Sequence, residues 1–125
     1  MTDPFGARFE LLRDSGQVSQ PAVDSTVEVI EAIERWDGRP LTEDNAAMFV
    51  THMVMAFERL MRGEELNEVP EEVLDEIRQY PETRAFVGDT VSKVLEPRGV
   101  RVPDAEVAYL ALHLAAIQRS HEEAG

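Results

Sequence analysis

Apolar residues recur at intervals of three and four along most of this chain, and the strict alternation typical of half-buried strands does not occur. The first such series is Phe5, Phe9 and Leu12, which is followed by Ser15-Gly16. Glycine directly after an amphipathic series commonly ends a helix. The pattern therefore predicts an all-α fold that begins with a short N-terminal helix.

Two longer helices are predicted next. The second begins near Ser19, whose side-chain oxygen is expected to cap it ahead of Pro21, and it ends near Asp37-Gly38. Thr42 is expected to cap the third helix, which extends to about Arg62. A capping residue precedes each of these helices, and Gly38 and Gly63 follow them.

Proline and glycine divide the second half of the chain. Pro81 removes a backbone donor and obstructs the preceding turn, so a fourth helix is expected to kink or break there. The apolar stripe resumes at Phe86 or Val87 and stops at Pro97-Arg98-Gly99. The last helix is expected from about Asp104 to Gln118.

These segments predict a compact bundle of about five helices. A chain of 125 residues has the length of one domain, so residues 1–125 are expected to form a single domain. Residues 119–125 are polar, and we expect this tail to fray.

Charge and composition exclude several functions. Twelve Lys and Arg against 25 Asp and Glu give a net charge of −13, which opposes direct binding to nucleic acid and to anionic lipid. The sequence has no cysteine, and it shows neither a signal-peptide pattern nor an apolar run long enough to span a membrane. We therefore expect a cytoplasmic protein that contacts neither nucleic acid nor membrane.

Two histidines lie on predicted amphipathic faces. On the third helix, Met48, His52, Met55 and Arg59 follow one another at offsets of four, three and four, so they share a face. This spacing places a guanidinium two turns, or about 10 Å, beyond an imidazole. We expect His52 to point inward or to line a cleft.

The last helix repeats this arrangement with the opposite charge. Glu106, Tyr109, His113 and Ile117 share a face, and the carboxylate precedes the imidazole by two turns. We expect the helices of His52 and His113 to pack together so that both rings line one cleft. A single inward histidine is commonly a satisfied core residue, and His121 in the polar tail is best explained as exposed.

The residues from Asn45 through His52 to Arg59, together with Val102-Pro-Asp-Ala-Glu106 and the following segment to His113, resemble the PTS regulation domain, or PRD. Members of this family resemble the chain in a His-x6-Arg segment, a later Glu-x6-His segment and a break such as Tyr80-Pro81 between them. The resemblance covers about Phe9 to Gln118. The chain is expected to be a single copy without an attached effector domain.

The resemblance implies a five-helix bundle, dimeric in many members, that is a regulatory domain rather than an enzyme and has no cofactor. It further implies that His52 and His113 accept phosphate from phosphotransferase proteins, either the phosphocarrier HPr or an enzyme II component. Arg59 and Glu106 would then be charged neighbours of the phosphate, and Asn45 a residue of the helix start or the cleft. Such a domain would act on gene expression or metabolism through a partner.

The chemistry of these residues agrees with that implication. An imidazole must present an unprotonated ring nitrogen to accept a phosphoryl group, and apolar surroundings favour the neutral ring. The phosphoryl group adds about −1.5 to −2 charges, which a nearby arginine can offset.

Two other functions remain open at this point. A metal-dependent enzyme could use His52, His113 and Glu106 as ligands, although the chain contains no His-Glu-x-x-His or Glu-x-x-His pair. A helical adaptor would keep both histidines as inert core residues. Metal analysis of the purified protein and the double substitution of both histidines by alanine distinguish these alternatives from a phosphoacceptor.

Overall fold

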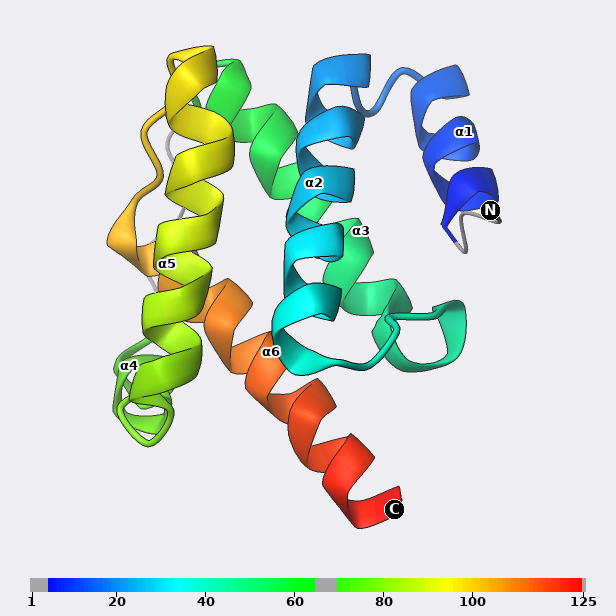
Figure 1. The fold of residues 1–125 in the computed structure, drawn as a ribbon. Coiled ribbons are helices and arrows are strands. Elements are labelled where there is room, and N and C mark those ends of the chain that lie inside the picture. Colours follow the sequence, from blue (N-terminus) through cyan, green and yellow to red (C-terminus); the bar gives the residue numbers. More distant parts are fainter. Residues whose placement is uncertain (1–4, 65–69, 125) are drawn as a thin grey trace. The chain divides into compact units, whose positions relative to one another are not determined.

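The computed structural model describes the backbone of residues 5–64 and 70–124 and the side chains of residues 5–64 and 70–120. All regular structure in these ranges is helical (Figure 1), which confirms the predicted all-α class. The side chain of His121 lies outside the described side chains. In chain order, the elements are α1 (Gly6–Asp14), α2 (Gln20–Asp37), α3 (Glu43–Met61), α4 (Glu71–Ile77), α5 (Pro81–Leu95), the short 3-10 helix η1 (Glu96–Arg98) and α6 (Asp104–Ala124).

Glycine and proline end the helices much as predicted. Gly38 caps the end of α2 with a φ of 77°, a left-handed conformation that favours glycine. Pro81 is the first residue of α5, so the predicted fourth helix is broken into α4 and α5. This break explains why the described residues form six α-helices rather than about five.

Two helix ends differ from the prediction. Ser19 occupies the N-cap position of α2 but forms no side-chain capping bond there. Its backbone N–H instead donates to Glu58 Oε1 at 2.7 Å. Helix α6 continues to Ala124, well beyond the expected end at Gln118, because residues 119–124 contain neither glycine nor proline.

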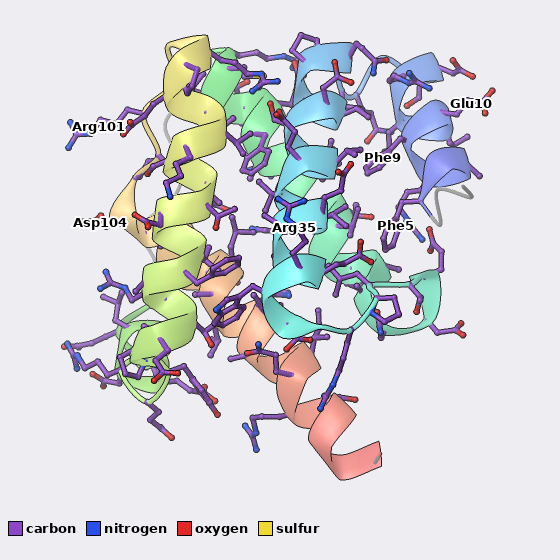
Figure 2. The ribbon with its side chains drawn as sticks, viewed as in Figure 1. Phe5, Phe9, Glu10, Arg35, Arg101 and Asp104 are labelled. Atoms are coloured by element: carbon purple, nitrogen blue, oxygen red, sulfur yellow. The ribbon has the colours of Figure 1, made fainter. Side chains whose placement is uncertain are left out.

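The chain divides into two compact units, Met1–Glu64 and Glu65–Gly125. In the first unit α2 packs against α3. The side chains of Phe5 and Phe9 are at most 2% exposed and lie on the side of α1 that faces these two helices (Figure 2). The two phenylalanine rings contact each other in a tilted arrangement, with centroids 6.3 Å apart. Burial of these rings attaches the N-terminal helix to its unit.

In the second unit α6 packs against both α4 and α5. Its centre consists of fully buried aliphatic side chains on α5 and α6, among them Val91, Leu95, Leu110 and Leu114. Thr83 Oγ1 on α5 donates to Gln118 Oε1 on α6 at 3.1 Å, which ties the start of α5 to the later turns of α6. None of the described helices combines the length and the apolar character needed to cross a membrane.

Candidate functional site

Helix α3 carries His52 at the border of its buried face. The side chains of Phe49, Val50, Met53 and Phe57 are buried, whereas the His52 side chain is half-buried. The ring is therefore partly surrounded by protein while part of it is accessible. A half-buried position suits a side chain that must react with another macromolecule.

The face that His52 shares with its predicted neighbours is more exposed than expected. Met48 is 78% exposed, Met55 is half-buried and Arg59 is exposed. The predicted apolar stripe is thus the edge of the buried face, and the core of the unit uses the neighbouring residues of α3. The physical reason is that α3 is apolar around most of its circumference from Ala46 to Phe57, so spacing alone does not identify the buried side.

Two interactions orient α3 around His52. Arg8 on α1 donates to Glu43 from two of its three guanidinium nitrogens, Nε to Oε1 at 3.0 Å and Nη2 to Oε2 at 2.8 Å. Its Nη1 also donates to Oγ1 of Thr51, the residue before His52, at 3.0 Å. The hydrogen bonds from Arg8 lower the pKa of Glu43, so this ion pair persists to acidic pH.

Asn45 is part of the start of α3. The backbone N–H of Thr42, the N-cap residue, donates to Asn45 Oδ1 at 2.8 Å. Asn45 Nδ2 donates in turn to the carbonyl of Pro40 at 3.3 Å. These two bonds hold the turn before α3, so Asn45 has the helix-start position that was one of its two predicted roles.

Helix α6 carries His113 in a more constrained setting. The rings of Tyr109 and His113 stack with centroids 5.7 Å apart and an interplanar angle of 25°. Both side chains are half-buried. This contact orients the imidazole ring.

This stacking was not part of the sequence prediction, which treated Tyr109 only as an apolar residue of the His113 face. The signal was nevertheless available, because an aromatic residue four positions before a histidine lies one turn away on the same face of a helix. Tyr109 is therefore an additional residue of the candidate site.

Glu106 occupies the first turn of α6 and is only 6% exposed. This buried carboxylate lies two turns, or about 10 Å, before His113 on the same helix. Arg59 on α3 is exposed, in contrast. The two charges predicted beside the histidines thus lie in different environments.

His52 and Arg59 belong to the first unit, and Glu106 and His113 belong to the second. The expectation that both rings line one cleft stays a prediction. Within the described residues, no group of three or more His, Cys, Asp and Glu side chains is arranged to hold a metal ion.

The sequence of this chain is similar to known proteins. The chain is similar to "Uncharacterized protein YhfY" of Escherichia coli (strain K12), with 26% identity over 116 residues that cover 93% of this chain and 96% of the relative. No solved structure matches the chain significantly. The family profile described as "PRD domain" matches residues 27–117, a range that begins within α2 and includes both His52 and His113. The chain therefore belongs to the PRD domain family.

Proposed function

We propose that this protein is a regulatory phosphoacceptor whose His52 and His113 receive phosphoryl groups from the sugar phosphotransferase system. The observation that carries the proposal is the presence of two half-buried histidines within the segment matched by the PRD domain family. A PRD domain is a regulatory domain rather than a catalyst. The donor would be HPr or an enzyme II component, and the reaction would take place in the cytoplasm.

The settings of the two rings support this role. His52 borders a surface that includes the exposed Met48, and a flexible, polarisable methionine side chain suits contact with a partner protein. The stacked Tyr109 ring restricts rotation of His113. A restricted ring keeps its reacting nitrogen in a limited range of directions, which favours transfer from a bound donor.

Incubation of the protein with phosphoenolpyruvate, enzyme I and HPr tests the proposal. We expect acid-labile phosphate on the wild type, reduced incorporation in His52→Ala and in His113→Ala, and no incorporation in the double variant. His121→Ala is the matched control because it removes the third histidine of the sequence, and we expect it to accept phosphate like the wild type.

Intact mass and circular dichroism of each variant confirm that it is folded. Equal phosphate incorporation in the wild type and the double variant contradicts the assignment of these two residues. A double variant that differs from the wild type only in stability favours the inert adaptor instead.

Phosphorylation is proposed to change the association of the protein with itself or with a partner. Many PRD domains are dimers, and we propose a homodimer here whose packing depends on the charge of the two histidines. The regulated process, gene expression or metabolism, would then be controlled through the partner that reads this packing. Arg59 and Glu106 are the proposed charged neighbours of the phosphorylated residues.

The two sites should respond unequally to negative charge. At His113 an added charge meets the buried Glu106 about 10 Å away along α6, whereas at His52 the exposed Arg59 on the same face of α3 can bend toward it. We expect His113→Asp to lower the free energy of unfolding by about 1 kcal/mol more than His52→Asp does, each measured against its His→Ala control.

Urea unfolding and sedimentation velocity of the four variants measure this difference. The alanine controls are required because loss of packing alone also destabilises the protein. The proposed asymmetry is contradicted if the free energy of unfolding differs between the Asp and the Ala variant by the same amount at His52 and at His113.

A further inference from the structure

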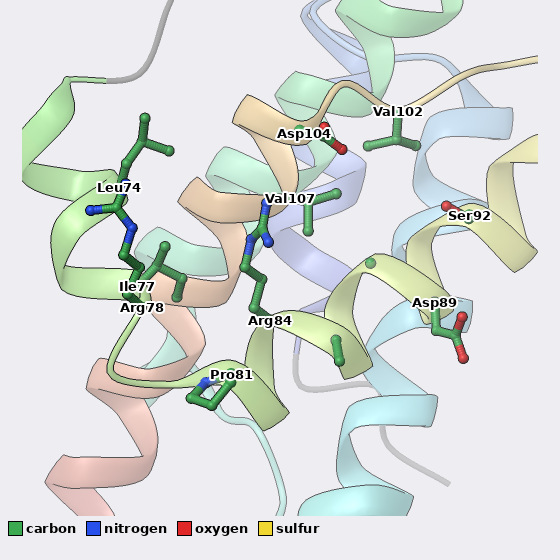
Figure 3. A pocket seen from close by; sticks show the side chains of 12 residues that line it. Leu74, Ile77, Arg78, Pro81, Arg84, Asp89, Ser92, Val102, Asp104 and Val107 are labelled. Carbon is green, nitrogen blue, oxygen red and sulfur yellow. The ribbon is translucent and has the colours of Figure 1, made fainter.

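A pocket lies within the second unit, between α4, α5 and the start of α6 (Figure 3). Its apolar wall includes Ile77 of α4, Val102 before α6 and Val107 on α6. Side chains of both charges surround this wall, although the chain as a whole is strongly acidic. The phosphoacceptor proposal above does not use this pocket.

The basic side of the pocket is formed by two arginines that differ in their partners. Arg78 forms an ion pair with Asp75 one turn earlier on α4. Within the described part of the chain, no ion pair or side-chain hydrogen bond engages Arg84, whose side chain extends from α5 toward the wall formed by α6 (Figure 3). In a chain with 25 acidic residues, an arginine left without such a partner inside a pocket is available to an anionic ligand.

The other side of the pocket carries oxygen atoms. Ser92 lies on α5, and Asp104 lies in the first turn of α6. Asp89 on α5 is exposed and forms an ion pair with Lys93 one turn later. Carboxylate and hydroxyl oxygens accept hydrogen bonds from ligand hydroxyl groups, and the two carboxylates repel a second anion. The pocket therefore suits a molecule with one anionic end and several hydroxyl groups.

Gly88, which also lines the pocket, is a second observation that favours a ligand there. It lies inside α5, where glycine is less favourable than alanine, and its φ is not in the left-handed region. A Cβ built at this position would have Val107 Cγ1, at 3.4 Å, as its nearest neighbour, which is the lower limit of ordinary contact distances. Helix packing therefore does not require the glycine, whereas a side chain there would fill part of the pocket that Gly88 lines.

We propose that this pocket binds a small phosphorylated sugar. The phosphate binds Arg84 through paired hydrogen bonds, the sugar hydroxyl groups bind Asp104 and Ser92, and the carbon skeleton of the ring lies against Val107. Gly88 leaves the space that the sugar ring occupies.

Isothermal titration calorimetry tests the proposal on the full chain without any phosphodonor. The probes are glucose 6-phosphate, ribose 5-phosphate and fructose 6-phosphate, with inorganic phosphate and glucose as reference ligands. We expect at least one sugar phosphate to bind at least tenfold more tightly than either reference ligand, and Arg84→Gln to weaken its binding at least tenfold. Arg35→Gln is the matched control because it removes an exposed positive charge on α2, outside the pocket (Figure 2).

The variant Gly88→Ala tests whether Gly88 is needed for ligand binding or for the packing of α5. Because alanine favours the helix and fits the space, we expect this variant to raise Tm by about 2–4 °C and to weaken sugar phosphate binding. Gly88→Leu is expected to abolish binding. A lower Tm for Gly88→Ala with unchanged binding overturns the assigned role of Gly88.

Three results overturn the proposal as a whole. These are binding of inorganic phosphate as tight as that of every sugar phosphate, equal effects of Arg84→Gln and Arg35→Gln, and failure of all three probes to bind at about 10 mM. None of them bears on the phosphoacceptor assay, which measures transfer to His52 and His113.

Discussion

Replacing Glu58 with alanine should lower the free energy of unfolding by about 3 kcal/mol. Glu58 lies on α3 and is only 6% exposed, yet its carboxylate is well supplied with donors. Ser19 N–H donates to Oε1 at 2.7 Å, and Arg62 Nε lies 2.6 Å from Oε2. Alanine would leave the Ser19 N–H without this acceptor at the start of α2 and would leave a cavity.

Arg62→Ala is the matched control for this substitution. The Arg62 side chain is 53% exposed, so its removal should cost less than about 1 kcal/mol. Urea denaturation followed by circular dichroism measures both variants. Similar losses for Glu58→Ala and Arg62→Ala would show that the salt bridge, rather than the buried bond to Ser19, is the main contribution of Glu58.

The same carboxylate should contribute to the pH dependence of stability. Burial raises the pKa of Glu58, but the hydrogen bonds from Ser19 and the ion pair with Arg62 outweigh burial, so its pKa in the folded protein is lowered. The stability that Glu58 contributes is therefore complete above the ordinary glutamate pKa of about 4.3 and is lost as the pH falls through the lower folded value. Glu58→Gln, which keeps an acceptor oxygen, should show a shallower loss of stability below about pH 4.5.

The second large effect is expected in the other unit. Leu110→Ala should lower the free energy of unfolding by about 3 kcal/mol, because the Leu110 side chain on α6 is fully buried and the alanine leaves a cavity. Leu112 is half-buried on the same helix, and we expect Leu112→Ala to cost about 1 kcal/mol. Equilibrium urea unfolding distinguishes the two, and a larger loss for Leu112 would contradict the burial pattern of α6.

The helix boundaries were predictable from the sequence where a single residue determines the local backbone conformation. Gly38 and Pro81 end or begin helices through their own backbone geometry, so a single residue carries the information. The end of α6 was not predictable in this way. The polar residues after Gln118 are compatible with either a helix or a tail.

The surroundings of the candidate site were less predictable because they depend on residues far apart in the sequence. The positions of His52 and His113 on helical faces follow from spacing, but the buried side of α3 is ambiguous in an apolar segment. The contact between Arg8 and Glu43 spans 35 positions, and nothing in the local pattern of either residue indicates it. The pocket around Arg84 likewise requires α4, α5 and α6 together.

Helix α1 is packed into the first unit, yet it lies outside residues 27–117, the range that matches the family. The folded structure is therefore longer than the segment that identifies the family. A fragment cut at residue 27, where the family match begins, would lose the first seven residues of α2 and all of α1. It would remove Phe9 from the interior of the first unit and Arg8 from its contact with Thr51, beside His52. It would also remove Ser19, which would leave the buried Glu58 without its backbone donor. Expression of residues 27–117 alone would therefore yield a weakened fold in which the surroundings of His52 are changed, so a fragment used to study this histidine should begin before α1.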